Sequence, residues 1–159
     1  MSQRANALAD RVLAGAKALA DYAQSLTDAQ WRTAIAPDGR TAGVLVHHVA
    51  SMYPVELDLT RVLAKGQAVT DVTWDVVKGI NAQHAAANAA ISKADALTLL
   101  KENSEAAAAA VRTFTDAELD GAAPLSLNNG APLTAQFFIE AHPVAHSFHH
   151  LRNMKAAFK

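Results

Sequence analysis

Apolar side chains recur every three or four positions along much of the chain, which is the period of an amphipathic helix. The first such stretch covers residues 4–26 and predicts a helix of about six turns. The residues on its apolar face are Leu8, Val12, Leu19, Tyr22 and Leu26. The next four residues, Thr-Asp-Ala-Gln at 27–30, form a capping box that predicts a short extra helical turn.

The same period predicts two further helices in the middle of the chain. Thr41 is a suitable N-cap for a second helix that runs to about Leu63 and ends before Gly66. Pro54 lies inside this helix and is expected to kink or split it. A third helix begins near Thr73 and reaches about residue 91. We interpret its apolar stripe as a core face; the residues are Val77, Ile80, Ala87 and Ile91.

The last third of the chain repeats the order of signals seen in the first. Ser92 begins another apolar stretch that ends near Phe114, and this stretch either continues the third helix as one bent helix or forms a separate one. A second capping box at 115–118 precedes a loop over 121–132. Thr134 then caps a last helix that extends to the C-terminus. The pattern indicates two similar halves.

These elements together predict an all-α fold. No stretch shows the alternation of a half-buried strand. We therefore expect a four-helix bundle with short extra helical turns after the first and third long helices. The length of 159 residues suits one domain, covering 1–159, around a single core.

Composition narrows the classes of function. The net charge is -1, so the chain lacks the excess of Lys and Arg that binding to nucleic acid requires. No apolar run approaches the roughly 20 residues that span a bilayer, and the polar N-terminus lacks a secretory signal. Cysteine is absent, which excludes disulfides and thiolate ligands. We expect a cytoplasmic protein whose metal ligands, if any, are nitrogen and oxygen.

One histidine falls on the apolar face of the predicted second helix. His48 lies at the centre of a stripe formed by Val44, Met52, Val55 and Leu59, whereas His47 lies on its flank. A buried imidazole needs partners for its ring nitrogens, because an unpaired buried polar group costs about 1–3 kcal/mol. His48 is therefore either a core histidine bonded to another side chain or a metal ligand.

Two more histidines share one face of the last helix. His146 and His150 are four residues apart, a spacing that lets two imidazoles reach one metal ion. The alternative is that the stripe containing Phe148 faces the core and both histidines are solvated. A third interpretation is that the helix is covered on both sides, with a partner subunit over part of the Phe148 side. This predicts a homodimer.

The predicted third helix contributes another inward imidazole. His84 lies within its apolar stripe and is flanked by Asn81 and Asn88. It is expected to act as a fourth ligand, as a partner of a ligand or as a substrate-binding group. The alternative is an internal hydrogen-bond network of His84 with the two asparagines.

Several histidines that converge in a helical bundle indicate a metal site. A di-iron carboxylate centre requires paired Glu-x-x-His motifs, which the chain lacks. A closed structural zinc site typically uses cysteine and four protein ligands. Three neutral imidazoles leave room for water or substrate, which is typical of a catalytic ion.

Two segments of the chain resemble the DinB-like metal-binding bundles. The first is TAGVLVHHVA at residues 41–50, which is similar to the capped second helix of that family. The second is HSFHH at residues 146–150, similar to its His-x-x-His-His stretch. The chain departs from the family at Pro143 and after His150, where Leu-Arg-Asn replaces the common Arg/Gly-Gln tail.

The resemblance implies one divalent metal ion held by His48, His146 and His150. It also implies a dimeric enzyme of the thiol S-transferase or isomerase type, which uses a low-molecular-weight thiol against a small electrophile. Zinc or nickel is the expected metal, with iron or manganese as alternatives, because all of these accept imidazole. His84 and Asn81 are the expected catalytic residues, ahead of Tyr53 and Arg152. The rival hypotheses are a non-catalytic metal- or ligand-binding stress-response module, a hydrolase that uses bound water, and a protein without a metal.

Overall fold

Serine and threonine side chains mark the starts of the long helices. The computed structural model describes residues 2–159. At the start of each long helix, the side-chain hydroxyl of the cap residue accepts a hydrogen bond from the backbone N–H three residues later. This bond pairs an N–H group that the helix itself leaves without a partner. The caps are Ser2, Thr41, Thr73, Ser92 and Thr134. The predicted starts at Thr41 and Thr134 are confirmed.

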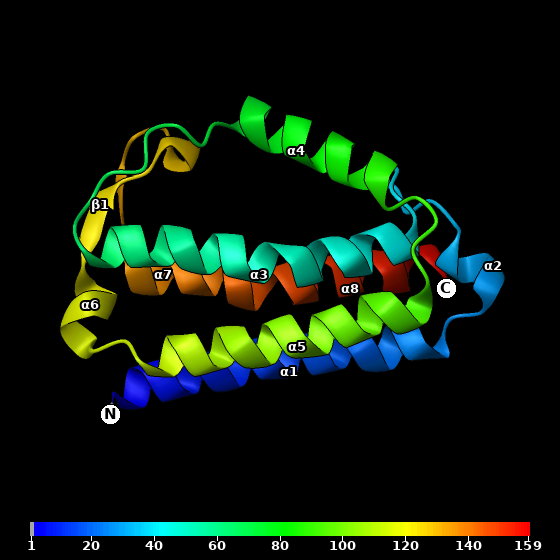
Figure 1. Cartoon of the computed structure of the whole chain (residues 1–159), viewed down its shortest axis with the longest axis horizontal. Coiled ribbons are helices and arrows are strands. Elements are labelled where there is room, and N and C mark those ends of the chain that lie inside the picture. Colours follow the sequence, from blue (N-terminus) through cyan, green and yellow to red (C-terminus); the bar gives the residue numbers. More distant parts are fainter. Residues whose placement is uncertain (1) are drawn as a thin grey trace.

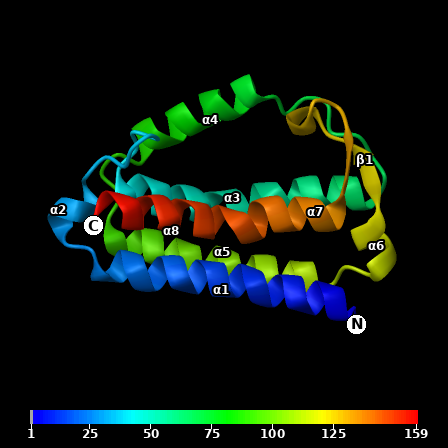
Figure 2. The same cartoon turned by 180° about the vertical axis from the view of Figure 1, so that it is seen from behind.

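Four long helical segments pack side by side as a bundle (Figures 1 and 2). Helix α5 packs against both α1 and α3, and α1 also packs against α8. The four segments are α1 (Gln3–Ser25), α3 (Ala42–Ala64), α5 (Lys93–Arg112) and the last helix, which comprises α7 (Ala135–Ile139), a π-helical turn η2 (Glu140–Val144) and α8 (Ala145–Ala157). The predicted all-α four-helix bundle is confirmed.

Short elements connect the long helices at both ends of the bundle. The predicted extra turns are α2 (Asp28–Trp31) after α1 and α6 (Asp116–Asp120) after α5, and each has its complete capping box. The structure also contains two short strands that the sequence analysis did not identify. Strands β1 (Ala122–Pro124) and β2 (Pro132–Thr134) pair antiparallel around a 3₁₀ turn, η1 (Ser126–Asn128). Three residues are too few for a recognisable alternation pattern.

Helix α3 is continuous through Pro54, so of the two predicted effects, a kink or a split, the split is not observed. Proline has no N–H to donate to the carbonyl four residues earlier, which here belongs to Ala50. The side chain of Asn103 on α5 supplies the missing donor, with 2.9 Å between its Nδ2 and the Ala50 oxygen. The neighbouring helix thus compensates for the proline.

The last helix accommodates its proline by a local change of pitch. Pro143 lies inside η2, where the wider π-helical turn replaces the regular α-helical pattern. The chain returns to α-helix at Ala145 and continues through His146 and His150.

Helix α4 (Trp74–Ala87) lies outside the four-helix bundle, over α3 (Figure 1). None of its residues is buried, and Ile80 is 50% exposed. The prediction of a core stripe was therefore wrong for Val77, Ile80 and Ala87, whereas Ile91, which follows α4, is partly buried against the main core. The alternative of two separate helices is the one observed, because α4 ends before Ser92 begins α5.

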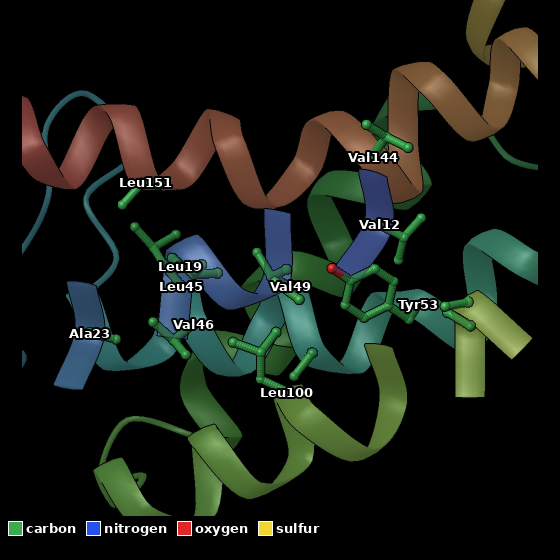
Figure 3. Packing of buried hydrophobic residues seen from close by; sticks show 14 of the residues in the cluster. Val12, Leu19, Ala23, Leu45, Val46, Val49, Tyr53, Leu100, Val144 and Leu151 are labelled. Atoms are coloured by element: carbon green, nitrogen blue, oxygen red, sulfur yellow. The ribbon is translucent and has the colours of Figure 1, made fainter. Parts of the chain in front are cut away.

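The main core lies between the four long segments and is mostly aliphatic (Figure 3). Tyr53 is fully buried in it, with its hydroxyl oxygen 2.8 Å from that of Ser147. Gly15 permits the close approach of α1 to α8, since an added Cβ would lie 3.1 Å from the ring of Phe148.

Among residues 2–159, no helix is long and apolar enough to cross a bilayer.

Candidate metal centre

Three histidines from α3 and α8 converge on one point between these helices. One ring nitrogen from each of His48, His146 and His150 lies within 4.8 Å of the other two. The ring centroids of His48 and His146 are 4.9 Å apart, and those of His146 and His150 are 5.1 Å apart. The spacing of four residues on α8 sets the second distance, because residues at i and i+4 share a helix face.

The cluster is enclosed by protein, although all three side chains are polar. His48 and His150 are each 4% exposed, and the side chain of His146 is 17% exposed. The alternative of two solvated histidines on α8 is therefore wrong. Burial lowers the pKa of His48 to about 2 and that of His150 to about 3, because the charged imidazolium loses its hydration. Both rings are neutral at pH 7, which is the form that binds metal.

Sequence reasoning missed Glu56, a buried carboxylate beside the cluster. It is 4% exposed, and its Oε1 lies 2.9 Å from Nδ1 of His146. A carboxylate bonded to the outer ring nitrogen of a ligating histidine fixes the orientation of the ring and raises its basicity. The available signal was the spacing: His48, Met52 and Glu56 follow one another at intervals of four along α3.

Two enclosed polar atoms of the site have no hydrogen-bond partner among residues 2–159. They are Nδ1 of His150 and Oε2 of Glu56. Buried polar atoms are rarely left unpaired, because each costs about 1–3 kcal/mol. Three converging imidazoles, an oriented outer nitrogen and these unpaired atoms fit a divalent cation that prefers nitrogen and oxygen ligands.

A cavity of about 460 Å³ opens beside the histidines, between α3, α4 and α8. Its polar wall includes His48, His146, His150 and Asn81. The rest of the wall is mainly apolar and includes Met52, Val55, Leu59, Trp74, Val77 and Phe138. Part of each stripe predicted for the second and third helices therefore lines this cavity, namely Met52, Val55 and Leu59 of one and Val77 and Ile80 of the other. Its volume suits a small molecule.

His84 lies behind the cluster rather than within it. Its Nε2 is 2.8 Å from Nδ1 of His47 and 3.3 Å from the hydroxyl of Ser51. Its ring centroid is 5.5 Å from that of His48. The alternative of a network between the His84 ring and Asn88 is not observed, because Asn88 bonds the backbone carbonyl of His84 instead.

The two weaker candidates do not reach the cavity wall in the part of the chain that the structure describes. Tyr53 is in the main core, with its hydroxyl bonded to Ser147. Arg152 is exposed and contacts His149 across 3.4 Å.

A family model of the DinB superfamily matches residues 12–154. The chain belongs to the DinB superfamily. The matched residues include all or part of each of the four long segments, and they include His48, His146 and His150. No curated protein sequence matches the chain.

Two solved structures show how this DinB superfamily member compares in fold. YfiT from Bacillus subtilis, titled a probable metal-dependent hydrolase with an unusual four-helix bundle topology, superposes with a TM-score of 0.78 at 18% identity. The match covers 98% of this chain and 87% of YfiT. A mycothiol-dependent maleylpyruvate isomerase matches with a TM-score of 0.71 at 12% identity, over 97% of this chain and 63% of its own. At these identities the likeness establishes the fold.

Proposed function

We propose that this DinB superfamily protein is a mononuclear metal-dependent enzyme that joins a small thiol to a small, largely apolar electrophile. The observation that carries the proposal is the position of three histidines, two of them buried, in the wall of a mainly apolar cavity. His48, His146 and His150 would hold the ion, with zinc or nickel ahead of iron or manganese. The ion would supply Lewis acidity, which polarises an electrophile and lowers the pKa of a nucleophile beside it.

The residues around the histidines would orient the reactants and move protons. Asn81 lines the cavity and would position the substrate through its amide group. The His84–His47 pair would carry a proton away from the cavity, because its ring nitrogens lie 2.8 Å apart and His47 is only partly buried. The apolar wall would exclude water from the reacting groups.

A hydrolase is the second candidate, and Glu56 favours it. This carboxylate lines the cavity, and its Oε2 has no hydrogen-bond partner among residues 2–159. It could therefore hold a water molecule beside the histidines and accept its proton, without any thiol.

Metal binding is tested first, with protein purified without a histidine tag. We expect one equivalent of metal in the wild type and a large loss in His48→Ala and in His150→Ala. His149→Ala is the matched control, because His149 is adjacent in sequence but exposed. Stoichiometric metal in both ligand variants would exclude this ligand set.

Activity is then measured on the metal-loaded protein. One assay follows conjugation of 1-chloro-2,4-dinitrobenzene with low-molecular-weight thiols, and the other follows 4-nitrophenyl ester hydrolysis without thiol. A thiol-dependent rate that disappears in His150→Ala supports the transferase. Hydrolysis without thiol supports the second candidate. The absence of metal-dependent turnover in both assays would favour a non-catalytic binding module.

We also propose that the protein acts in the cytoplasm as a single domain and a homodimer. Support for the dimer comes from the last helix, where Phe137 is 54% exposed and Phe148 is 43% exposed. Both side chains belong to the last helical segment, whose Phe148 side is the one expected to meet a partner subunit, and exposed large apolar groups there favour an association surface. Sedimentation at micromolar concentration tests the proposal, and a strictly monomeric protein would refute it.

A further inference from the structure

One charged group in the cavity wall has no part in the proposed chemistry. Arg40 lies in the loop before α3 and lines the same cavity as the histidines, although its side chain is only 14% exposed. Asp38 holds one edge of its guanidinium, with 2.6 Å from Nε to Oδ1 and 2.7 Å from Nη2 to Oδ2. This paired contact fixes the orientation of the planar group.

The other edge of the guanidinium still has N–H groups without an acceptor in the described part of the chain. Nη1 of Arg40 is enclosed and has no hydrogen-bond partner among residues 2–159. The guanidinium of arginine stays protonated even when one of its nitrogens has no acceptor. An acceptor that enters the cavity would therefore meet a preoriented cationic donor. The charge of Arg40 also contributes to the low pKa of both His48 and His150, after burial and His146, which is consistent with their proximity.

Arg40 lies at the opposite end of the cavity from the apolar wall. Along α3 the lining residues run from His48 to Leu59, a distance of about 16 Å at 1.5 Å per residue. Arg40 precedes this helix, whereas Leu59, Trp74 and Phe138 surround the far end. The histidines therefore separate a cationic end from an apolar end.

The charges at the cationic end also favour an anion. The charges of Asp38 and Arg40 balance each other, and the low pKa values of His48 and His150 leave these two rings uncharged at pH 7. A divalent ion would then leave a net positive charge after the single negative charge of Glu56 is subtracted. A carboxylate placed at Nη1 of Arg40 would reduce this excess.

We propose that Arg40, oriented by Asp38, forms a carboxylate-binding subsite next to the three histidines. The inference rests on the proposed function and specifies its reactants. One reactant carries a carboxylate, and the apolar part of the bound molecules occupies the part of the cavity lined by α4. The carboxylate belongs either to the apolar electrophile or to the thiol. Planar paired donors suit a carboxylate, and each charge-assisted hydrogen bond strengthens its binding.

Binding is measured by calorimetry, because this readout does not depend on turnover. The first pair of probes is 4-phenylbutyrate and its neutral amide, which place the carboxylate on an apolar body. The second pair is 3-mercaptopropionate and its amide, which place it on a thiol. In each pair the ratio of the two affinities measures the preference for a carboxylate. The pair that shows the preference identifies the reactant that carries the group.

Each titration uses metal-free and zinc-loaded protein, because a carboxylate could also bind the ion. We expect the acid of at least one pair to bind about tenfold to a hundredfold more tightly than its amide, in both forms. In Arg40→Gln this preference should fall close to one in the metal-free protein. Arg61→Gln is the matched control, since Arg61 is an exposed residue of α3 paired with Asp58.

Two results would overturn the subsite. One is the absence of a carboxylate preference in metal-free wild type with either pair, a measurement that needs no variant. The other is a preference that survives Arg40→Gln. If Arg40→Gln does not fold, Arg40→Lys should retain only part of the preference, because lysine keeps the charge but loses the paired donors. A protein that prefers the acid but turns nothing over would keep the subsite and remove the proposed activity.

Discussion

Glu56 is the residue whose environment bears most directly on the candidate metal centre. A carboxylate that is only 4% exposed is costly unless hydrogen bonds or a cation compensate for its lost hydration. One oxygen has such a partner in Nδ1 of His146, while the other has none among residues 2–159. We interpret Glu56 as a positioning residue that accepts a hydrogen bond from Nδ1 of His146 and leaves the lone pair of Nε2 free to bind an ion.

Replacing Glu56 therefore tests the centre without removing a ligand. We expect Glu56→Gln to weaken Zn²⁺ binding by about tenfold to a hundredfold, because the amide keeps the shape but not the charge. Competition with a chromophoric chelator measures the affinity. Asp58→Asn is the control, an exposed carboxylate on the same helix. An unchanged affinity in Glu56→Gln would show that Glu56 does not support the ion.

The two most buried histidines make the metal-free protein sensitive to acid. Their folded-state pKa values are about 2 for His48 and about 3 for His150, below the value of 6.5 for a free side chain. Between pH 6.5 and about pH 3, these two histidines bind protons in the unfolded chain but not in the folded protein. The free energy of unfolding therefore decreases as the pH falls from 6.5 towards 3.

The expected slope is about 1.4 kcal/mol per pH unit for each of these histidines once the pH is well below 6.5. Urea denaturation of the metal-free protein at a series of pH values measures it. In His150→Gln the slope should decrease by about the contribution of one histidine. An identical pH profile in this variant would contradict the low pKa of His150.

At the residue scale, the sequence predicted the three converging histidines but not their surroundings. His48 was recognisable because a polar ring interrupts an apolar face, and His146 and His150 because of their spacing. Glu56 was missed because glutamate is common on exposed helix faces, so its place on the same face of α3 as His48 was not distinctive until its partner was known. Arg40 was missed for the same reason, since its role depends on the cavity.

Helix α3 shows how one element relies on another. The carbonyl of Ala50 cannot be bonded by Pro54, and the side chain of Asn103 on α5 donates to it instead. The contact joins two adjacent helices of the bundle through a hydrogen bond that the backbone of α3 cannot make.

We expect Asn103→Ala to lower the free energy of unfolding by about 1–3 kcal/mol, because it leaves this carbonyl without a donor. The same substitution should cost less in a Pro54→Ala background, where residue 54 regains its N–H. Chemical denaturation of the two single variants and the double variant measures the coupling. Additive effects would mean that Asn103 does not compensate for the proline.

Element starts were predictable, whereas the environment of each helix was not. A cap depends on residues three positions apart, so Thr41 and Thr134 could be identified locally. The stripe with Val77 and Ile80 was correctly seen as one apolar face of a helix, but periodicity does not say what covers that face. In the structure it faces a cavity instead of the core.

At the scale of the whole molecule, α4 forms a wall of the cavity that lies outside the four-helix bundle. It has no buried residue, and contacts near its two ends hold it in place. At one end Trp74 Nε1 donates to the carbonyl of Leu127, and near the other His84 is paired with His47. An isolated helix of this length is only marginally stable in water.

We therefore expect the backbone amides of α4 to exchange with deuterium before those of α5, which packs against two helices. Hydrogen exchange followed by mass spectrometry measures this, with α5 as the internal reference. The neutral 4-phenylbutyramide should slow exchange in α4 and leave α5 unchanged, since its apolar body would bury Val77 and Ile80. Equal protection of α4 and α5 in the free protein would contradict the prediction, because it would mean that this wall of the cavity is as stable as the bundle.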